Sequence, residues 1–279
     1  MKSGWKIFWI IILILTVLGF VCGGIALGLG VTMADFDNDF DIQERSIIIS
    51  KDSSSTTASS AELYEFENIT DLEISVGACE VIIQASNTDT VQVDVSRLKY
   101  SALGLDLSVE EDNGTLLVRT MKDGNVWDVI SAKNNNGGIL KIYLPENMSL
   151  STAVFEFGAC EVEISNLTVG HMDLFIGAVD CEMERMNLSS LHAEVGAGSL
   201  DYSGTISGDV SIECGAGEVD LELSGTEKEF NYDLSAGLGE VEIGEKEYGG
   251  FAVDKTINNH ADKNMVIECG AGSVSVDFR

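Results

Sequence analysis

Short stretches in which apolar and polar residues alternate follow one another along most of the chain beyond residue 64. In residues 210–214, Val210, Ile212 and Cys214 alternate with polar residues, a pattern typical of a β-strand that buries one face. After the next Gly-Ala pair the alternation resumes in residues 219–221, but the apolar residues now occupy the opposite parity of positions. The change of parity predicts a corner between two strands at residues 215–216, where Gly supplies unusual backbone dihedrals and Ala a small side chain.

This strand-corner-strand unit recurs along the chain in seven copies. From Gly158 to Gly215 the copies follow one another at a constant 19-residue interval, and the last two intervals are wider. The copies begin at Gly77, Gly158, Gly177, Gly196, Gly215, Gly237 and Gly270.

Equal 19-residue steps predict an all-β fold, a β-solenoid or β-helix-like stack of coils. Each coil would hold two short strands, the corner between them and a polar return, and neighbouring coils would pair in parallel. An antiparallel β-sandwich built from the same strands is the alternative, but a sandwich has no reason to repeat its sequence.

The part before the regular repeats is less uniform. Residues 66–144 keep one copy and then diverge, whereas residues 145–279 hold the regular repeats, and we expect residues 64–279 to form one β-strand-repeat domain. The pattern predicts strands at residues 91–95, 103–109, 115–120 and 139–144, with a hairpin turn at Asp112-Asn113-Gly114. Residues 123–138 are expected to form a polar loop.

An uncharged apolar segment opens the chain. Residues 7–34 contain no charged side chain and are long enough to cross a bilayer. Lys2 and Lys6 precede this segment and Asp35 follows it, so the positive-inside rule places residues 1–6 in the cytoplasm and the domain outside the cell. A cleaved signal peptide is the alternative, although its apolar region is usually only about 7–15 residues long. We therefore expect a single-pass signal anchor in the cell membrane, followed by an acidic and Ser-rich flexible linker at residues 35–63.

The quoted residues resemble one known family. The corners read G-A-G-x-V or G-A-C-E-V, a hairpin is inserted, and a strand ends in Tyr143-Leu144-Pro145 before the regular repeats. Together with the anchor, these features resemble the bacterial putative-adhesin family of toast-rack-like β-strand-repeat domains over residues 64–279. The resemblance implies a surface or envelope role, in adhesion or envelope-stress signalling, and carries over no catalytic residue.

The charge of the chain excludes one class of partner. The sequence holds 46 acidic and 16 basic residues, a formal charge of −30 and a pI near 4.1. Such a surface repels phosphate backbones, so no nucleic-acid partner is expected.

Cysteines and histidines are the candidates for chemistry. Cys181, Cys214 and Cys269 occupy core-facing repeat positions and are expected to be buried free thiols. Cys79 and Cys160 share one repeat position, so a disulfide between them requires adjacent coils. The three histidines, His171, His192 and His260, fall at unrelated repeat positions, and the repeat predicts no Ser, Cys or carboxylate partner beside them. We therefore identify no catalytic residue and expect a protein that is not an enzyme.

Acidic residues recur at the outward positions three and five residues after the first Gly of each copy. If the coils stack at about 4.8 Å, these carboxylates form a double acidic ladder on one face. Like charges directly opposite in a sheet are destabilising, so the ladder is either a device for solubility or a surface that attracts cations. No cofactor is expected under the first interpretation, and weakly bound Ca²⁺ or Mg²⁺, or a cationic peptide, under the second. The candidate residues are Glu161, Glu163, Asp180, Glu182, Asp201, Glu218, Asp220, Glu240 and Glu242.

Two functions fit these observations. In the first, the chain is a membrane-anchored, non-enzymatic surface protein, an adhesin or an envelope structural module that binds another envelope or surface protein. Because the chain ends at Arg279, just past its last strand, the final coil is expected to offer an unpaired edge to that partner. The alternative is an accessory protein for sensing envelope stress, whose acidic face binds divalent cations or cationic peptides.

Overall fold

The computed structural model describes residues 63–77, 79–98, 106–121, 138–249 and 252–279. The chain divides into two compact units, Met1–Ala58 and Ser59–Arg279, and the first unit lies outside the described residues. The predicted cytoplasmic tail, the anchor and all of the linker except Leu63 also fall outside them. The described part of the chain contains no helix with the length and apolar character needed to cross a bilayer.

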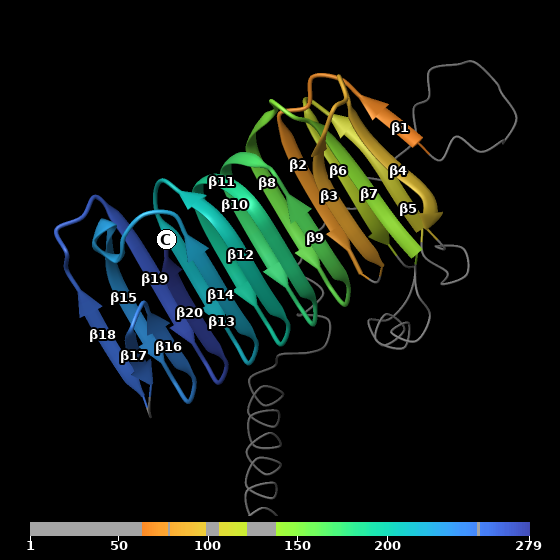
Figure 1. The fold of residues 1–279 in the computed structure, drawn as a ribbon. Helices are drawn as coiled ribbons and strands as arrows, with labels where there is room; N and C mark the ends of the chain where they lie inside the picture. Colours follow the sequence, from red (N-terminus) through yellow and green to blue (C-terminus); the bar gives the residue numbers. More distant parts are fainter. Residues whose placement is uncertain (1–62, 78, 99–105, 122–137, 250–251) are drawn as a thin grey trace, which may run out of the picture. The chain divides into compact units, whose positions relative to one another are not determined.

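The described residues of the second unit fold into two β layers that enclose one apolar core (Figure 1). Side chains alternate between the core and solvent along the strands, as the sequence predicts. Among the described residues no polar or charged residue is buried. In hydrogen-bonding order, the first layer consists of β5 (Asp106–Asp112), β6 (Thr115–Met121), β2 (Asp71–Val76), β8 (Ser149–Phe157), β10 (Thr168–Ile176), the second part of β11 (Asp180–Val195), β13 (Val210–Cys214), β19 (Lys263–Cys269), β15 (Phe230–Ala236) and β18 (Val253–Ile257).

The second layer holds the strand that follows each corner. β11 belongs to both layers, because its first part pairs with β9 and β12 and its second part with β10 and β13. In hydrogen-bonding order, this layer consists of β1 (Leu63–Phe66), β4 (Val91–Leu98), β7 (Gly138–Pro145), β3 (Glu80–Ser86), β9 (Glu161–Ser165), the first part of β11, β12 (Ser199–Ile206), β14 (Glu218–Leu223), β20 (Ser273–Phe278), β16 (Glu240–Ile243) and β17 (Lys246–Gly249).

The register confirms the stacked coils and rules out the sandwich. In parallel pairing, Asp180 lies opposite Ser199, and Ser199 lies opposite Glu218, so each step to the next strand equals one repeat of the sequence. The polar segment between β14 and β15 contains one short 3₁₀ turn, Glu227–Glu229. The predicted hairpin turn is also confirmed between β5 and β6, where Asn113 and Gly114 have φ of +54° and +86°.

The order of the coils in space differs from their order in the sequence. The coil formed by β19 and β20 lies between the β13–β14 coil and the β15–β16 coil, so the expectation that it offers a free edge is wrong. At the other end, β2 and β3 lie between the β6–β7 coil and the β8–β9 coil, which places the described strands of residues 66–144 in the same stack. Antiparallel strands flank both end coils, β18 and β17 at one end and β5 and β4 at the other. Such strands cover backbone groups that an exposed parallel edge would leave unpaired.

The corners stack on one another through backbone hydrogen bonds. The amide of Gly196 donates to the carbonyl of Ile176 at 2.7 Å, and the amide of Gly215 donates to that of Val195 at 2.8 Å. No described corner glycine from residue 158 on has φ in the left-handed region, so the expectation of unusual dihedrals is wrong. These glycines are required because the neighbouring coil is too close for a side chain: a Cβ at Gly198 would lie 2.1 Å from the Val179 carbonyl oxygen.

Candidate functional site

The predicted acidic ladder lies on the outward face of the second layer. Within it, Glu161 lies opposite Asp180, and Glu163 opposite Glu182. The second row continues from Glu182 to Asp201 and on to Asp220, while the first row passes through Ser199 to Glu218. The structure therefore brings seven of the nine predicted carboxylates onto four neighbouring strands.

The ladder is interrupted before its last two members. Because β20 is inserted between β14 and β16, Ser273 and Ser275 stand between the acids of β14 and those of β16. Glu240 and Glu242 are thereby separated from Glu218 and Asp220. The prediction of one continuous ladder is wrong at this point, since it assumed that coils stack in sequence order.

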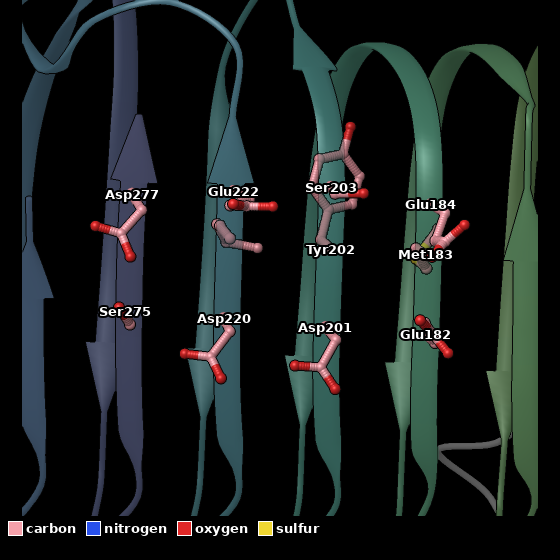
Figure 2. Close-up of a pocket in the computed structure, with 11 residues that line it drawn as sticks. Glu182, Met183, Glu184, Asp201, Tyr202, Ser203, Asp220, Glu222, Ser275 and Asp277 are labelled. Carbon is pink, nitrogen blue, oxygen red and sulfur yellow. The ribbon is translucent and has the colours of Figure 1, made fainter. Parts of the chain in front are cut away.

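A third, interrupted row of carboxylates extends the ladder along the strands: Glu222 lies opposite Asp277, whereas Ser203 on β12 stands between Glu222 and Glu184. Glu184, Glu222 and Asp277 join Glu182, Asp201 and Asp220 around a shallow, open depression on this face (Figure 2). The sequence contains the signal for this row, because Glu184, Glu222 and Asp277 each lie seven positions after the first Gly of their copy. The predicted ladder covered only positions three and five and missed this row.

Burial and neighbouring charges shift the pKa of carboxyl groups in the ladder. Partial burial raises the pKa of Asp220, and the negative charges of Glu218, Asp201 and Asp277 raise it further. Three contacts relieve the repulsion: Ser199 Oγ donates a hydrogen bond to Asp180 Oδ1 at 3.2 Å, Arg279 Nη1 lies 2.8 Å from Glu222 Oε2, and Arg185 forms an ion pair with Glu184. The pKa of the separated Glu240 is raised by a hydrogen bond with Glu247 on the antiparallel strand β17.

The ladder does not gather its carboxylates around a point. Neighbouring strands in a sheet are about 4.8 Å apart, so in-register carboxylates form rows, whereas a Ca²⁺ site surrounds the ion with 6–8 oxygens at about 2.3–2.6 Å. Within the described residues, no group of three or more His, Cys, Asp and Glu side chains is placed to hold a metal ion.

Two histidines have polar partners that the repeat did not predict. His171 Nδ1 lies 2.7 Å from Ser190 Oγ, and its Nε2 lies 3.1 Å from Asp173 Oδ1. His192 Nε2 lies 3.3 Å from Glu194 Oε1. The expectation that no histidine has a Ser or carboxylate beside it is therefore wrong. Asp173 and Glu194 each lie two positions beyond their histidine on the same face, and Ser190 belongs to the next coil, directly opposite His171.

These histidines lie on the outward face of the first layer, opposite to the ladder. The His171 side chain is 48 % exposed and that of Asp173 is 28 % exposed. A catalytic triad requires a positioned nucleophile together with groups that stabilise an oxyanion. A hydrogen-bonded Ser-His-Asp group alone does not meet this requirement, and we assign it no catalytic role.

The cysteine predictions are confirmed where the structure tests them. Cys181, Cys214 and Cys269 are buried free thiols. Burial raises the pKa of Cys181, and it also raises that of Cys214, to about 11, so both remain protonated at neutral pH. Cys79 and Cys160 lie on adjacent coils, as a bond between them requires.

Comparison with known proteins supports the family resemblance. A family profile described as the N-terminal domain of toast_rack, DUF2154, matches residues 185–244, which run from within β11 to the residue after β16. No curated protein was found to match the chain.

The chain also matches solved structures of bacterial proteins, among them the following three. A putative cell adhesion protein from Clostridium sporogenes is 16 % identical with a TM-score of 0.39, and the match covers 78 % of this chain and 98 % of that one. A putative adhesin from Bacteroides fragilis is 11 % identical with a TM-score of 0.33, with coverages of 76 % and 94 %. A putative lipid binding protein from Parabacteroides distasonis is 15 % identical with a TM-score of 0.35, with coverages of 77 % and 95 %.

Proposed function

We propose that this toast-rack-like chain is a membrane-anchored, non-enzymatic surface module that binds another envelope or surface protein through the outer faces of its β stack. The observation that carries the proposal is the in-register parallel stack itself. Coils joined by backbone hydrogen bonds present an extended outer surface on which side chains repeat at fixed spacing. Repeat proteins use such surfaces to bind partners.

The position at the cell surface rests on the sequence. Residues 7–34 are uncharged and apolar, and they are flanked by Lys2 and Lys6 on one side and by acidic residues on the other. A signal anchor in this orientation holds the β stack outside the cell, with residues 35–63 as the tether.

A second candidate rests on the ladder. In that alternative, the carboxylates of β9, β11, β12 and β14 capture divalent cations or a cationic peptide, and the chain reports their capture to a membrane partner. The register favours it, because Glu182, Asp201 and Asp220 lie directly opposite one another on neighbouring strands. Burial raises the pKa of Asp220 and the neighbouring negative charges raise it further, so a cation placed there would relieve the repulsion between the carboxylates.

Topology is tested first. Intact cells that express the full chain with a C-terminal tag are treated with protease. We expect the tag to be removed while residues 1–6 stay protected, and a tag that survives on intact cells would refute the surface location.

Binding is then measured as the fraction of cells retained under flow on a layer of the same cells, with and without the chain. We expect the chain to raise retention, and we expect the variant with Glu161, Glu163, Asp180 and Glu182 changed to Gln or Asn to behave as the wild type does. The control neutralises four exposed acids outside the ladder, Glu67, Asp89, Glu146 and Glu245. If the chain does not raise retention, adhesion is refuted. If retention is lost only in the ladder variant, the second candidate is favoured.

A further inference from the structure

Two cysteines far apart in the sequence meet at the corners of adjacent coils. The amide of Gly158 donates to the carbonyl of Val76 at 3.0 Å, and the amide of Ala159 donates to that of Gly77 at 2.8 Å. On the other side of the pair, the register of β3 and β9 begins with Glu80 opposite Glu161. Cys79 and Cys160 therefore hold equivalent places in two hydrogen-bonded coils.

The spacing of these coils suits a covalent bond. Parallel neighbours are about 4.8 Å apart, and the Cα atoms of a disulfide are usually about 4.4–6.8 Å apart. The Cys160 thiol reaches the neighbouring coil, where it donates a hydrogen bond to the Val76 carbonyl at 3.5 Å, and it also interacts with the Cys79 thiol.

The two thiols differ in environment. Cys79 is 7 % exposed, whereas Cys160 is partly exposed at the surface of the corner. The hydrogen bond from the Cys79 thiol and the backbone amides around Cys160 lower the pKa of Cys160, while the same contact and burial raise that of Cys79. Cys160 is therefore the accessible nucleophile, and Cys79 is the buried resolving thiol next to it.

We propose that Cys79 and Cys160 form a reversible disulfide that locks the β2–β3 coil to the β8–β9 coil. The oxidant is a low-molecular-weight disulfide, R–S–S–R. The Cys160 thiolate attacks one of its sulfurs, forms a mixed disulfide and releases one RS⁻. The Cys79 thiol then loses its proton and attacks the Cys160 sulfur, which releases the second RS⁻. In total, two protein thiols are oxidised and one R–S–S–R is reduced to two R–SH.

The bond would have a mechanical consequence. It closes residues 79–160, which include β3 to β8, into one covalent loop. Long closed loops restrict the unfolded chain most, so oxidation should stabilise the stack. The inference concerns the fold and does not depend on the proposed binding function.

The chain offers a matched control pair. Cys214 lies directly opposite Cys269 on β13 and β19, but both are buried and Cys214 donates a hydrogen bond to the Gly217 carbonyl at 3.3 Å. This pair has a similar register without access to solvent. We expect it to stay reduced under conditions that oxidise Cys79 and Cys160.

The test uses the full chain, purified in detergent with Cys22 changed to Ser, and incubated with cystine at about pH 7.5. Remaining thiols are alkylated, and peptides are mapped by mass spectrometry with and without reductant. We expect a Cys79–Cys160 link in most molecules, free Cys181, Cys214 and Cys269, and a Tm higher by roughly 10 °C. If all five thiols stay reduced, or if Cys214–Cys269 links as readily, the proposal is overturned.

Two variants separate the bond from general effects of oxidation. C160A should lose the Tm increase on addition of cystine, while C181A should keep it. Because Cys79 is in the core, C79V provides a variant of similar volume in which Cys160 has no resolving thiol. In C79V we expect a stable mixed disulfide on Cys160. For the wild type, an intermolecular disulfide-linked dimer as the main product would refute the assignment.

Discussion

Replacing the corner glycine Gly217 with Ala tests the fold most directly. An added Cβ would lie 2.3 Å from the Gly198 carbonyl oxygen and 2.9 Å from Val195 Cγ1. The first contact is well short of the 3.4 Å at which ordinary van der Waals contact begins. Because Gly217 is not in the left-handed region, backbone conformation adds nothing to the cost, and the whole effect comes from the neighbouring coil.

The expected magnitude follows from two terms. Overpacking a close-packed site costs about 1–3 kcal/mol. The movement that relieves it also lengthens the hydrogen bond from the Glu218 amide to the Gly198 carbonyl, 3.0 Å long, which is worth about 1 kcal/mol. We expect G217A to lower the free energy of unfolding by about 2–4 kcal/mol and the Tm by roughly 5–15 °C.

Urea unfolding followed by circular dichroism measures this loss, and G249A is the matched control. A Cβ at Gly249 meets only ordinary contacts, the nearest with Glu240 Cγ at 3.4 Å, so we expect a change within about 0.5 kcal/mol. If G217A is as stable as the wild type, the corners do not stack at the distance that the structure gives, and our explanation of the Gly-Ala-Gly motif fails.

Three further predictions follow from the ladder and from the order of the coils. D201N removes a charge between Glu182 and Asp220 and should raise the free energy of unfolding, measured by urea titration, by about 0.5–1.5 kcal/mol at low salt. In about 1 M NaCl this gain should shrink, because salt screens the charges. The control E67Q, outside the ladder, should show no gain. Because the pKa of Asp220 is raised in the folded state, its ionised form lowers the free energy of unfolding above that pKa, and this loss disappears as the pH falls to the unfolded-state pKa. D220N should therefore be more stable than the wild type near pH 7 but not near pH 4. An equal gain in stability at both pH values would contradict this origin. Truncation after Gly249 removes β18, β19 and β20, and with them both neighbours of β15 and one neighbour of β16. Limited proteolysis should then cut residues 227–249 while the coils up to β14 resist. Protection of residues 227–249 would mean that β15 and β16 do not need these strands.

The positions of the strands and corners follow from the sequence because they depend on local alternation. The parity change at residues 215–216 requires a corner whatever surrounds it, and Asn113-Gly114 fixes a hairpin turn by itself. The constant repeat interval likewise fixes the register between successive coils, and it brought Asp180 and Glu182 opposite Glu161 and Glu163 as expected.

The order of the coils was not determined by the sequence, because every copy presents nearly the same apolar face and can stack on any other. Only the tertiary structure places β19–β20 beside β13–β14, which interrupts the acidic ladder with Ser273 and Ser275 and leaves no free edge at the final coil. The partners of His171 and the contact between Cys79 and Cys160 depend in the same way on which coils are adjacent. The sequence by itself determined what each coil looks like; which coil lies beside which was decided by long-range packing.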